Sequence, residues 1–278
     1  MRLLQQSLNS RNSALEAGTL VCILMLMHYE VGAGGLGTFQ PHLAGARQVM
    51  QCRGEERTPG CFVEQQIIVL DVMGSTSSSR SSTFSVADVQ SFTKSIEGHN
   101  CNWSSDLLAC PISLLEAILD ITSLYKSQFG PKNSNVSLDQ ILLQKRRVLS
   151  WQSSAAQSDI QWHLTEAFRY GIILYLLRLF NLMTDLMELR LMTKNVICHI
   201  GAIPTSSGWG YQSIWPLFQA AIVVTCDGER NWFRLRLIEM QQSSGCSVNA
   251  GALKVLERQW SLGSTDWEWG SDLELMLV

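Results

Sequence analysis

The chain has 278 residues, of which 46% are hydrophobic and 16% charged, and its formal net charge is -3. Proteins that bind duplex DNA neutralise its phosphates with clustered Lys and Arg, so this charge balance argues against direct contact with nucleic acid. The low charged fraction favours wide helix-packing surfaces or a subunit interface, and the length is ample for one large core.

Helical periodicity dominates the chain. Apolar residues recur three and four positions apart, and β-branched runs occur only as short pieces within longer helical patterns. We therefore predict helices over residues 1–8, 13–30, 41–52, 61–73, 104–127, 138–151, 159–190, 214–224, 229–242 and 249–260. The expected fold class is all-α, a single-domain array of nine to twelve helices packed as antiparallel pairs over residues 1–278.

The first long helix contains an apolar run over residues 19–27. This run is much shorter than the roughly 20 residues of a membrane span, and Glu16 precedes it, so no membrane association is expected. A signal peptide is the alternative, because Arg2 and Arg11 are basic and residues 32–34 resemble a cleavage site.

Residues 32–37, Gly-Ala-Gly-Gly-Leu-Gly, have the glycine spacing of a dinucleotide-binding loop. Such a loop follows a β-strand, whereas the residues before this one are helix formers and Pro41 follows closely. We expect an interhelical loop here and no nucleotide cofactor.

Residues 74–83 form a low-complexity run in which seven of the first nine residues are Ser or Thr. This composition predicts a mobile surface loop, interpreted as a solvated linker with phosphorylation as the alternative. Lys145, Arg146 and Arg147 lie within a predicted amphipathic helix. They are interpreted as a solvated face, with part of a nuclear localisation signal as the alternative.

Neither the cysteines nor the histidines show the spacing of a metal or catalytic site. Zinc sites usually contain a Cys-x-x-Cys pair, and metalloprotease helices a His-Glu-x-x-His pair, and the chain has neither. We expect buried free thiols, with disulfides as the alternative, and histidines that are either core or exposed. The predicted set of catalytic, metal-binding, cofactor-binding and DNA-binding residues is therefore empty. The residues considered are Cys22, Cys52, Cys61, Cys101, Cys110, Cys198, Cys226, Cys246, His28, His42, His99, His163 and His199.

The most specific pattern lies between residues 214 and 260. Trp215-Pro216-Leu217-Phe218 opens a helix with proline in its first turn. Residues 227–229 form an acidic turn before an Arg-rich helix that contains residues 232–236. Asn249 is the predicted N-cap of a third helix, which ends in Leu-Glu-Arg-Gln-Trp at residues 256–260.

This pattern resembles the signature of the fungal-specific transcription factor regulatory domain, the helical region that follows the binuclear zinc cluster in many fungal transcription factors. Four further segments are similar to the family: His-Leu-Ala-Gly-Ala-Arg at 42–47, Ala-Cys-Pro at 109–111, Tyr-Leu at 175–176 and Asp-Trp at 266–267. The resemblance covers nearly the whole chain.

The resemblance implies a nuclear regulatory domain that controls an attached DNA-binding module. Control would be exerted through protein partners, homodimerisation or a small effector of open identity, with a metabolic or secondary-metabolite pathway as the target. Six closely spaced cysteines are absent, and Phe39-Gln40-Pro41 replaces the usual Trp ahead of His42. We therefore expect an N-terminally truncated domain without its zinc cluster.

Two other functions stay open on the residues alone. A helical scaffold or protein-interaction protein would show the same periodicity. An all-α enzyme with an apolar pocket could use the stripe of Leu164, Phe168 and Tyr175, although paired acidic metal-binding motifs are missing.

Overall fold

The computed structural model describes residues 17–32, 39–52, 62–98, 110–129, 135–153, 157, 159–182 and 185–262. Within these ranges the fold is all-α, with no strand, and the predicted class is confirmed. The elements are α3 (Ala17–Gly32), α4 (Phe39–Cys52), α5 (Phe62–Ser75), α6 (Val86–Gly98), α7 (Ile112–Ser127), α8 (Leu138–Ser150), α9 (Ile160–Leu179), α10 (Leu186–Gly201), the 3-10 helix η2 (Tyr211–Ser213), α11 (Ile214–Ala221), α12 (Asp227–Ser244) and α13 (Ser247–Leu262).

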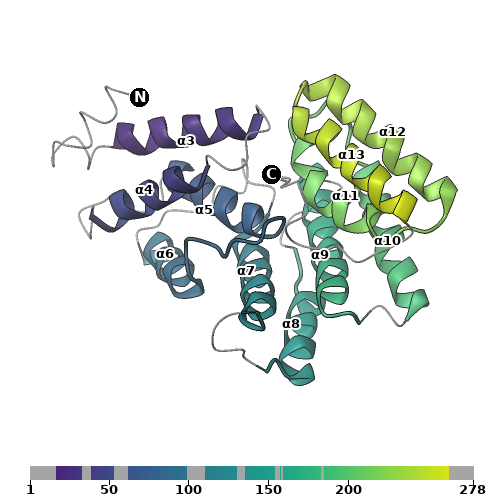
Figure 1. Ribbon diagram of the computed structural model, residues 1–278, viewed down its shortest axis with the longest axis horizontal. Helices are drawn as coiled ribbons and strands as arrows, with labels where there is room; N and C mark the ends of the chain where they lie inside the picture. The colour runs from purple at the N-terminus through teal and green to yellow at the C-terminus, as the bar shows by residue number, and fades with distance from the viewer. Residues whose placement is uncertain are drawn as a thin grey trace.

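The helices form two groups joined by α7 and α8. Helices α3 to α6 lie at one end of the molecule and α9 to α13 at the other (Figure 1). Helix α9 packs against α7, α8, α10 and α11. It is buried nearly all round, because its apolar residues are not confined to one stripe. One continuous hydrophobic core runs through both groups.

Local sequence signals explain where several helices begin and end. Ser137 and Gln140 form a reciprocal capping box at the start of α8, and the Asp159 carboxylate accepts the Gln161 backbone N–H at the start of α9. Gly245 ends α12 with a left-handed φ of 67°. The predicted N-cap Asn249 is wrong, because α13 begins two residues earlier, at Ser247.

The long helix predicted over 159–190 is two helices. Helix α9 ends at Leu179, Asn181 adopts a left-handed φ of 56°, and Asp185 caps α10 by accepting the N–H groups of Met187 and Glu188. The apolar period continues across this break, which is why periodicity hides it. Helix α6 was also not predicted. It begins where Ser85 and Asp88 bond each other reciprocally.

The Ser-rich segment 74–83 differs from the solvated loop expected there. Gly74 and Ser75 are the last residues of α5, and Ser75, Thr76 and Ser77 are buried. The interpretation as a solvated linker is wrong for this part of the run. The Ser75 and Thr76 hydroxyls donate to the Val72 and Met73 carbonyls of α5, which offsets the polarity of these two buried side chains. Its mobility stays a prediction. The predicted helix at 1–8, the loop after Gly32, residues 104–109 and Asp266-Trp267 lie outside the described residues.

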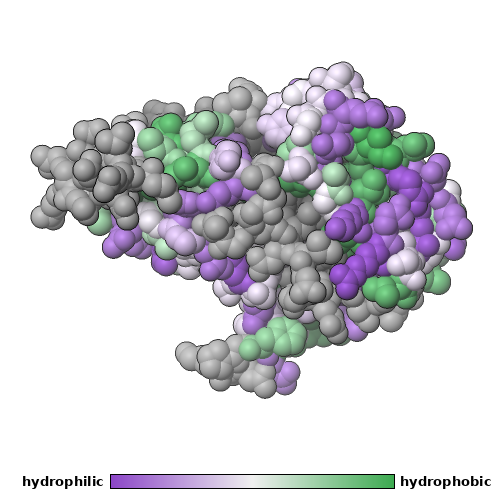
Figure 2. Space-filling model, turned by 45° about the horizontal axis from the view of Figure 1, so that its top comes forward, coloured by the Kyte–Doolittle hydropathy of each residue, from purple (hydrophilic) through white to green (hydrophobic). Residues whose placement is uncertain are grey.

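The outer face of α3 is apolar. Val21, Met25 and Tyr29, spaced four residues apart, are 43%, 64% and 74% exposed. Figure 2 shows a hydrophobic patch over this helix and further patches, bordered by polar residues, over the C-terminal helices. No helix in the described ranges combines the length and hydrophobicity that a bilayer crossing requires.

Candidate functional site: the junction around Trp215

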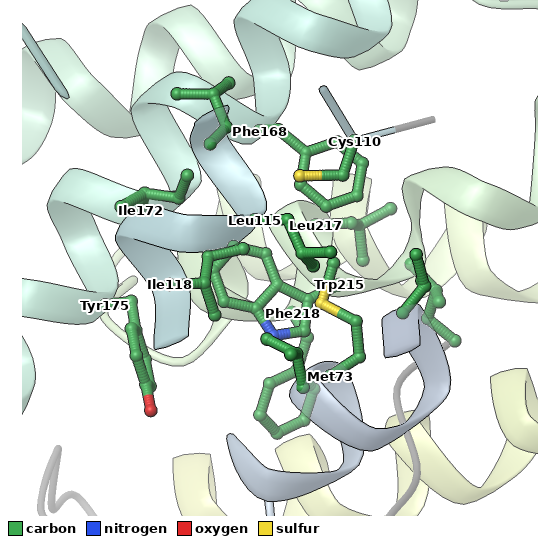
Figure 3. Packing of buried hydrophobic residues seen from close by; sticks show 14 of the residues in the cluster. Met73, Cys110, Leu115, Ile118, Phe168, Ile172, Tyr175, Trp215, Leu217 and Phe218 are labelled. Carbon is green, nitrogen blue, oxygen red and sulfur yellow. The ribbon is translucent and has the colours of Figure 1, made fainter. Parts of the chain in front are cut away.

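The resemblance points to Trp215, and the structure places this residue where the two helix groups meet. Its side chain is 1% exposed, and its ring stacks on Phe168 at a centroid distance of 5.8 Å. Figure 3 shows the indole enclosed by labelled side chains from α5, α7 and α9. Gly171 permits the close approach of α11 to α9, because a Cβ there would lie 2.9 Å from the Pro216 Cβ. The Trp-Pro-Leu-Phe segment is therefore a packing element.

One hydrogen bond joins Trp215 to the Ser-rich segment. The indole Nε1 donates to Thr76 Oγ1 at 2.8 Å, and the Thr76 hydroxyl donates to the Met73 carbonyl at 2.7 Å. The first bond spans 139 residues of sequence, so no local pattern could predict it. Through it, α11 is fixed to the end of α5.

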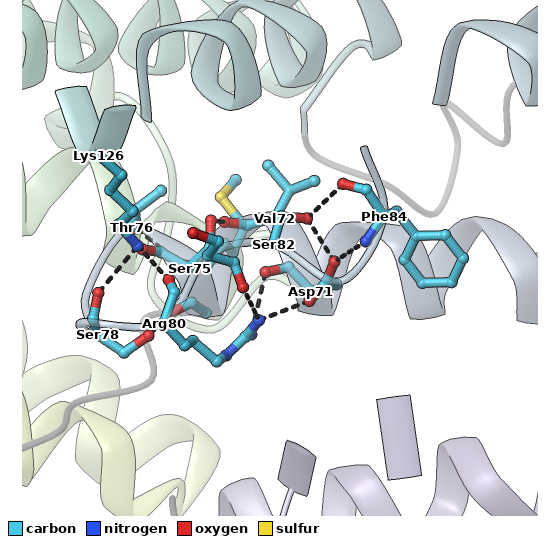
Figure 4. A network of polar contacts seen from close by, with 12 residues as sticks. Asp71, Val72, Ser75, Thr76, Ser78, Arg80, Ser82, Phe84 and Lys126 are labelled. Carbon is cyan, nitrogen blue, oxygen red and sulfur yellow. Dashed lines mark hydrogen bonds and ion pairs between the residues drawn. The ribbon is translucent and has the colours of Figure 1, made fainter. Parts of the chain in front are cut away.

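Asp71 organises the rest of the segment. Its carboxylate is fully buried and pairs with the Arg80 guanidinium at 2.6 Å. It also accepts the Ser82 hydroxyl and, at 2.9 Å, the Phe84 backbone N–H (Figure 4). A buried charge needs such partners. Asp71 thus folds residues 76–84 back onto α5.

Lys126, from α7, closes the same loop. Its ammonium donates to the Ser75 carbonyl at 2.6 Å, to the Ser78 carbonyl at 3.0 Å and to the Arg80 carbonyl (Figure 4). Burial, together with the neighbouring Arg80 charge and against the attraction of Asp71, lowers the pKa of Lys126 to about 7. A lysine of this pKa can change its charge near neutral pH.

The lowered pKa makes stability depend on pH. The unfolded chain, in which the lysine pKa is 10.5, binds more protons than the folded chain between pH 7 and 10.5. The free energy of unfolding should therefore rise with pH across this window, by about 1.4 kcal/mol per pH unit at most. We expect Lys126→Met to remove this rise between pH 7 and pH 9 in urea unfolding, whereas Lys194→Met, on an exposed side chain, should keep it. An equal rise in both variants would contradict the assignment.

The arginines of α12 brace its junctions with neighbouring segments. Arg230 Nε donates to the Val224 carbonyl at 3.2 Å, and Arg236 Nη2 donates to the Ile200 carbonyl at the end of α10 at 2.9 Å. Arg234 pairs with Glu257 on α13 at 2.6 Å. The Arg-rich part of the signature therefore holds α12 against α10 and α13.

Trp260 completes this unit. Its Nε1 donates to the Ala221 carbonyl at 2.9 Å, and the guanidinium carbons of Arg230 and Arg234 lie 5.7 Å and 5.6 Å from its ring centroid. The last tryptophan of the signature thus joins α13 to the end of α11.

Two of the three basic residues on α8 are paired. Lys145 bonds Glu188 at 2.6 Å, and Arg147 bonds Asp120 and Glu116 on α7 at 2.6 Å and 3.2 Å. Lys145 and Arg147 therefore bridge α8 to neighbouring helices and do not face solvent alone, as the interpretation of a plain solvated face expected.

Sequence reasoning missed one histidine pair. His163 on α9 and His199 on α10 approach to 3.1 Å between their Nδ1 atoms, and the Tyr170 ring stacks on His199. Burial lowers the pKa of His199, against the attraction of the Glu166 carboxylate. The pair is separated by 36 residues, so no spacing motif signals it.

The cysteines agree in part with expectation. All six that the structure describes are free thiols, but only Cys110 is buried, and burial raises its pKa well above the usual range. Exposed are Cys22, Cys52, Cys198 and Cys226. Across the described ranges, no three His, Cys, Asp or Glu side chains gather closely enough to hold a metal ion.

The described part of the chain is thus an all-helical domain whose charged groups brace helix junctions. A family model, the fungal specific transcription factor domain, matches residues 1–276. The chain belongs to this family, which is a family of transcription factor domains and not of enzymes. A search of curated proteins found no match, and neither did a search of solved structures.

Proposed function

We propose that this chain is the nuclear regulatory domain of a fungal transcription factor, controlling a metabolic or secondary-metabolite pathway. The observation that carries the proposal is the family match over residues 1–276, and the residues of the signature build one packed unit around Trp215 and Trp260. Transcriptional regulation is the activity, and no catalytic activity is proposed.

In this proposal the chain itself does not touch DNA. Support comes from the net charge of -3 and from the arginines of α12, each of which bonds a group within the domain. The six closely spaced cysteines of the family's zinc cluster do not occur among these 278 residues. DNA contact would then be supplied by a partner or by a segment joined to this one, and the domain would act through protein partners or as a homodimer.

A tethering experiment tests the proposal. The full chain is fused to a heterologous DNA-binding module, and transcription of a reporter carrying its site is compared with that of the module alone. We expect the fusion to raise or lower transcription, and a fluorescent fusion of the chain to accumulate in the nucleus. A cytoplasmic chain with no effect on the reporter would favour the helical scaffold instead.

A further inference from the structure

Arg178, near the end of α9, is a buried charge without a carboxylate partner in the described ranges. The side chain is 8% exposed, its Nη2 donates to Gln219 Oε1 at 3.0 Å, and its buried Nε has no hydrogen-bond partner. By contrast, Arg80 and Arg169 each form an ion pair with a neighbouring carboxylate. Guanidinium groups stay charged in proteins, so the charge of Arg178 requires another source of compensation.

The surroundings of Arg178 supply little negative charge. Its guanidinium carbon lies 5.7 Å from the Tyr175 ring centroid, and Gln219 is neutral. The end of α9 adds only about half a unit of negative charge through its last carbonyls. Burial accordingly lowers the pKa of Arg178, with Tyr175 and Tyr125 as the only opposing influences.

The same place offers a hydrogen-bond donor and an aromatic wall. Tyr125 lies on the last turn of α7, its ring meets Phe180 edge-on at 5.8 Å, and it is close enough to Arg178 to affect the arginine's pKa. No hydrogen bond uses the Tyr125 hydroxyl in the described part of the chain, whereas the Tyr175 hydroxyl is bonded to Thr122 at 2.9 Å. A planar guanidinium can bind both oxygens of a carboxylate, and a phenol hydroxyl can donate a further hydrogen bond to one of them.

We propose that Arg178, with Tyr125 and Gln219, forms a binding site for the carboxylate group of a small organic acid. The guanidinium binds the carboxylate through Nε and a terminal nitrogen, and the Tyr125 hydroxyl donates to one of its oxygens. The aromatic rings of Tyr175 and Phe180 favour an acid with an apolar body. The carboxylate site rests on the buried guanidinium of Arg178 and its unpartnered Nε, and only its role as the effector site rests on the proposed function.

The site lies beside the junction around Trp215. Tyr175 also contacts the Trp215 ring edge-on at 5.6 Å, and Lys126, which closes the Ser-rich segment, is the neighbour of Tyr125. An acid bound at Arg178 would therefore stabilise the ends of α7, α9 and α11 together, which is where the two helix groups meet.

Thermal unfolding of the purified full chain tests this site. The probes are acetate, succinate and benzoate as sodium salts, compared with sodium chloride at equal ionic strength. We expect Tm to rise with the concentration of at least one of these carboxylates, and the rise should become logarithmic in that concentration once the site is nearly saturated. Sodium chloride should cause no such rise. Arg178→Met should abolish the response, and Arg190→Met, which removes an exposed arginine, should keep it.

Tyr125→Phe keeps the site testable if Arg178→Met does not fold. It retains the ring contacts and removes one hydrogen bond to a charged group, so the carboxylate concentration needed for a given rise in Tm should increase about tenfold. A response that persists unchanged in both variants, or that chloride reproduces, overturns the proposal.

The chain's own acidic residues are the second source of a carboxylate. Those at 266, 268, 272 and 274 lie outside the described residues, and the variant D266N/E268Q/D272N/E274Q removes their charges. A response confined to this variant would assign the site to the chain's own carboxylates, and a response already present in the wild type would assign it to a free acid. No response in either protein overturns the proposal, and the reporter result is unaffected by that failure.

Discussion

Replacing Trp215 with alanine is expected to lower the free energy of unfolding by about 4 kcal/mol, the usual cost of deleting a buried aromatic side chain. The indole is 1% exposed, it packs against Phe168 and Tyr175, and it anchors Thr76 from the other helix group. Urea unfolding measures this change. The loss of stability should exceed the loss caused by replacing a nearby exposed aromatic residue with alanine.

Two matched variants separate packing from hydrogen bonding at this position. Trp215→Phe keeps much of the ring but leaves Thr76 without its donor, so a loss of about 1 to 2 kcal/mol is expected. Tyr211→Ala removes an aromatic ring that is 47% exposed, and its effect should stay within about 0.5 kcal/mol. Equal losses for Trp215→Ala and Tyr211→Ala would show that Trp215 does not hold the junction together.

Asp71→Asn is expected to cost about 3 to 5 kcal/mol, because it breaks the buried ion pair with Arg80. The carboxylate is fully buried, and it also holds the backbone of Phe84. Without these contacts, residues 76–84, the segment that contains Thr76, should unfold locally. Urea unfolding measures the stability, and proteolysis within residues 76–84 measures the local opening.

The pair of Asp88 with Arg47 is the control, since its side chains are 33% and 37% exposed. Asp88→Asn should cost about 1 kcal/mol or less, as expected for a surface ion pair. Adding Arg80→Met to Asp71→Asn should restore part of the lost stability, because the positive charge that Asp71 paired is then removed as well. A loss for Asp71→Asn as small as that for Asp88→Asn would contradict the role of Asp71 as the centre of the loop.

Periodicity and turn chemistry predicted the helices that begin or end at clear local signals. Pro216 marks the first turn of α11, and the Gly245 turn ends α12. The break between α9 and α10 escaped prediction, because Asn181 and Asp185 interrupt an apolar period that continues on both sides. The Ser- and Thr-rich run was predicted to be a solvated loop, because composition cannot show that Asp71 accepts the Ser82 hydroxyl or that Lys126 donates to the Ser75 carbonyl.

The candidate sites depend on contacts that no local pattern contains. Trp215 reaches Thr76 across 139 residues, and Arg178 reaches Gln219 across 41. The sequence shows that a tryptophan and an arginine occur at these positions, but it does not show that one meets a hydroxyl and the other lacks a carboxylate. The resemblance identified Trp215 and Tyr175 as signature positions, whereas nothing in the sequence singled out Arg178 or Tyr125.

The junction gives the proposed regulation a physical basis. Residues from α5, α7, α9 and α11 meet there, so a change in one helix group alters the contacts of the other. Regulation through this junction requires two states that differ in these contacts. An effector bound beside Tyr175 or a partner bound to either group would favour one of them.

Chromatin immunoprecipitation of the tagged chain from its own host tests the central claim most directly. A regulatory domain of a transcription factor, whether joined to a DNA-binding module or bound to one, is predicted to be enriched at a discrete set of promoters. Transcripts of the neighbouring genes should change when the chain is removed. A chain that is expressed and folded, yet shows no promoter enrichment and no such transcript changes, would contradict the account.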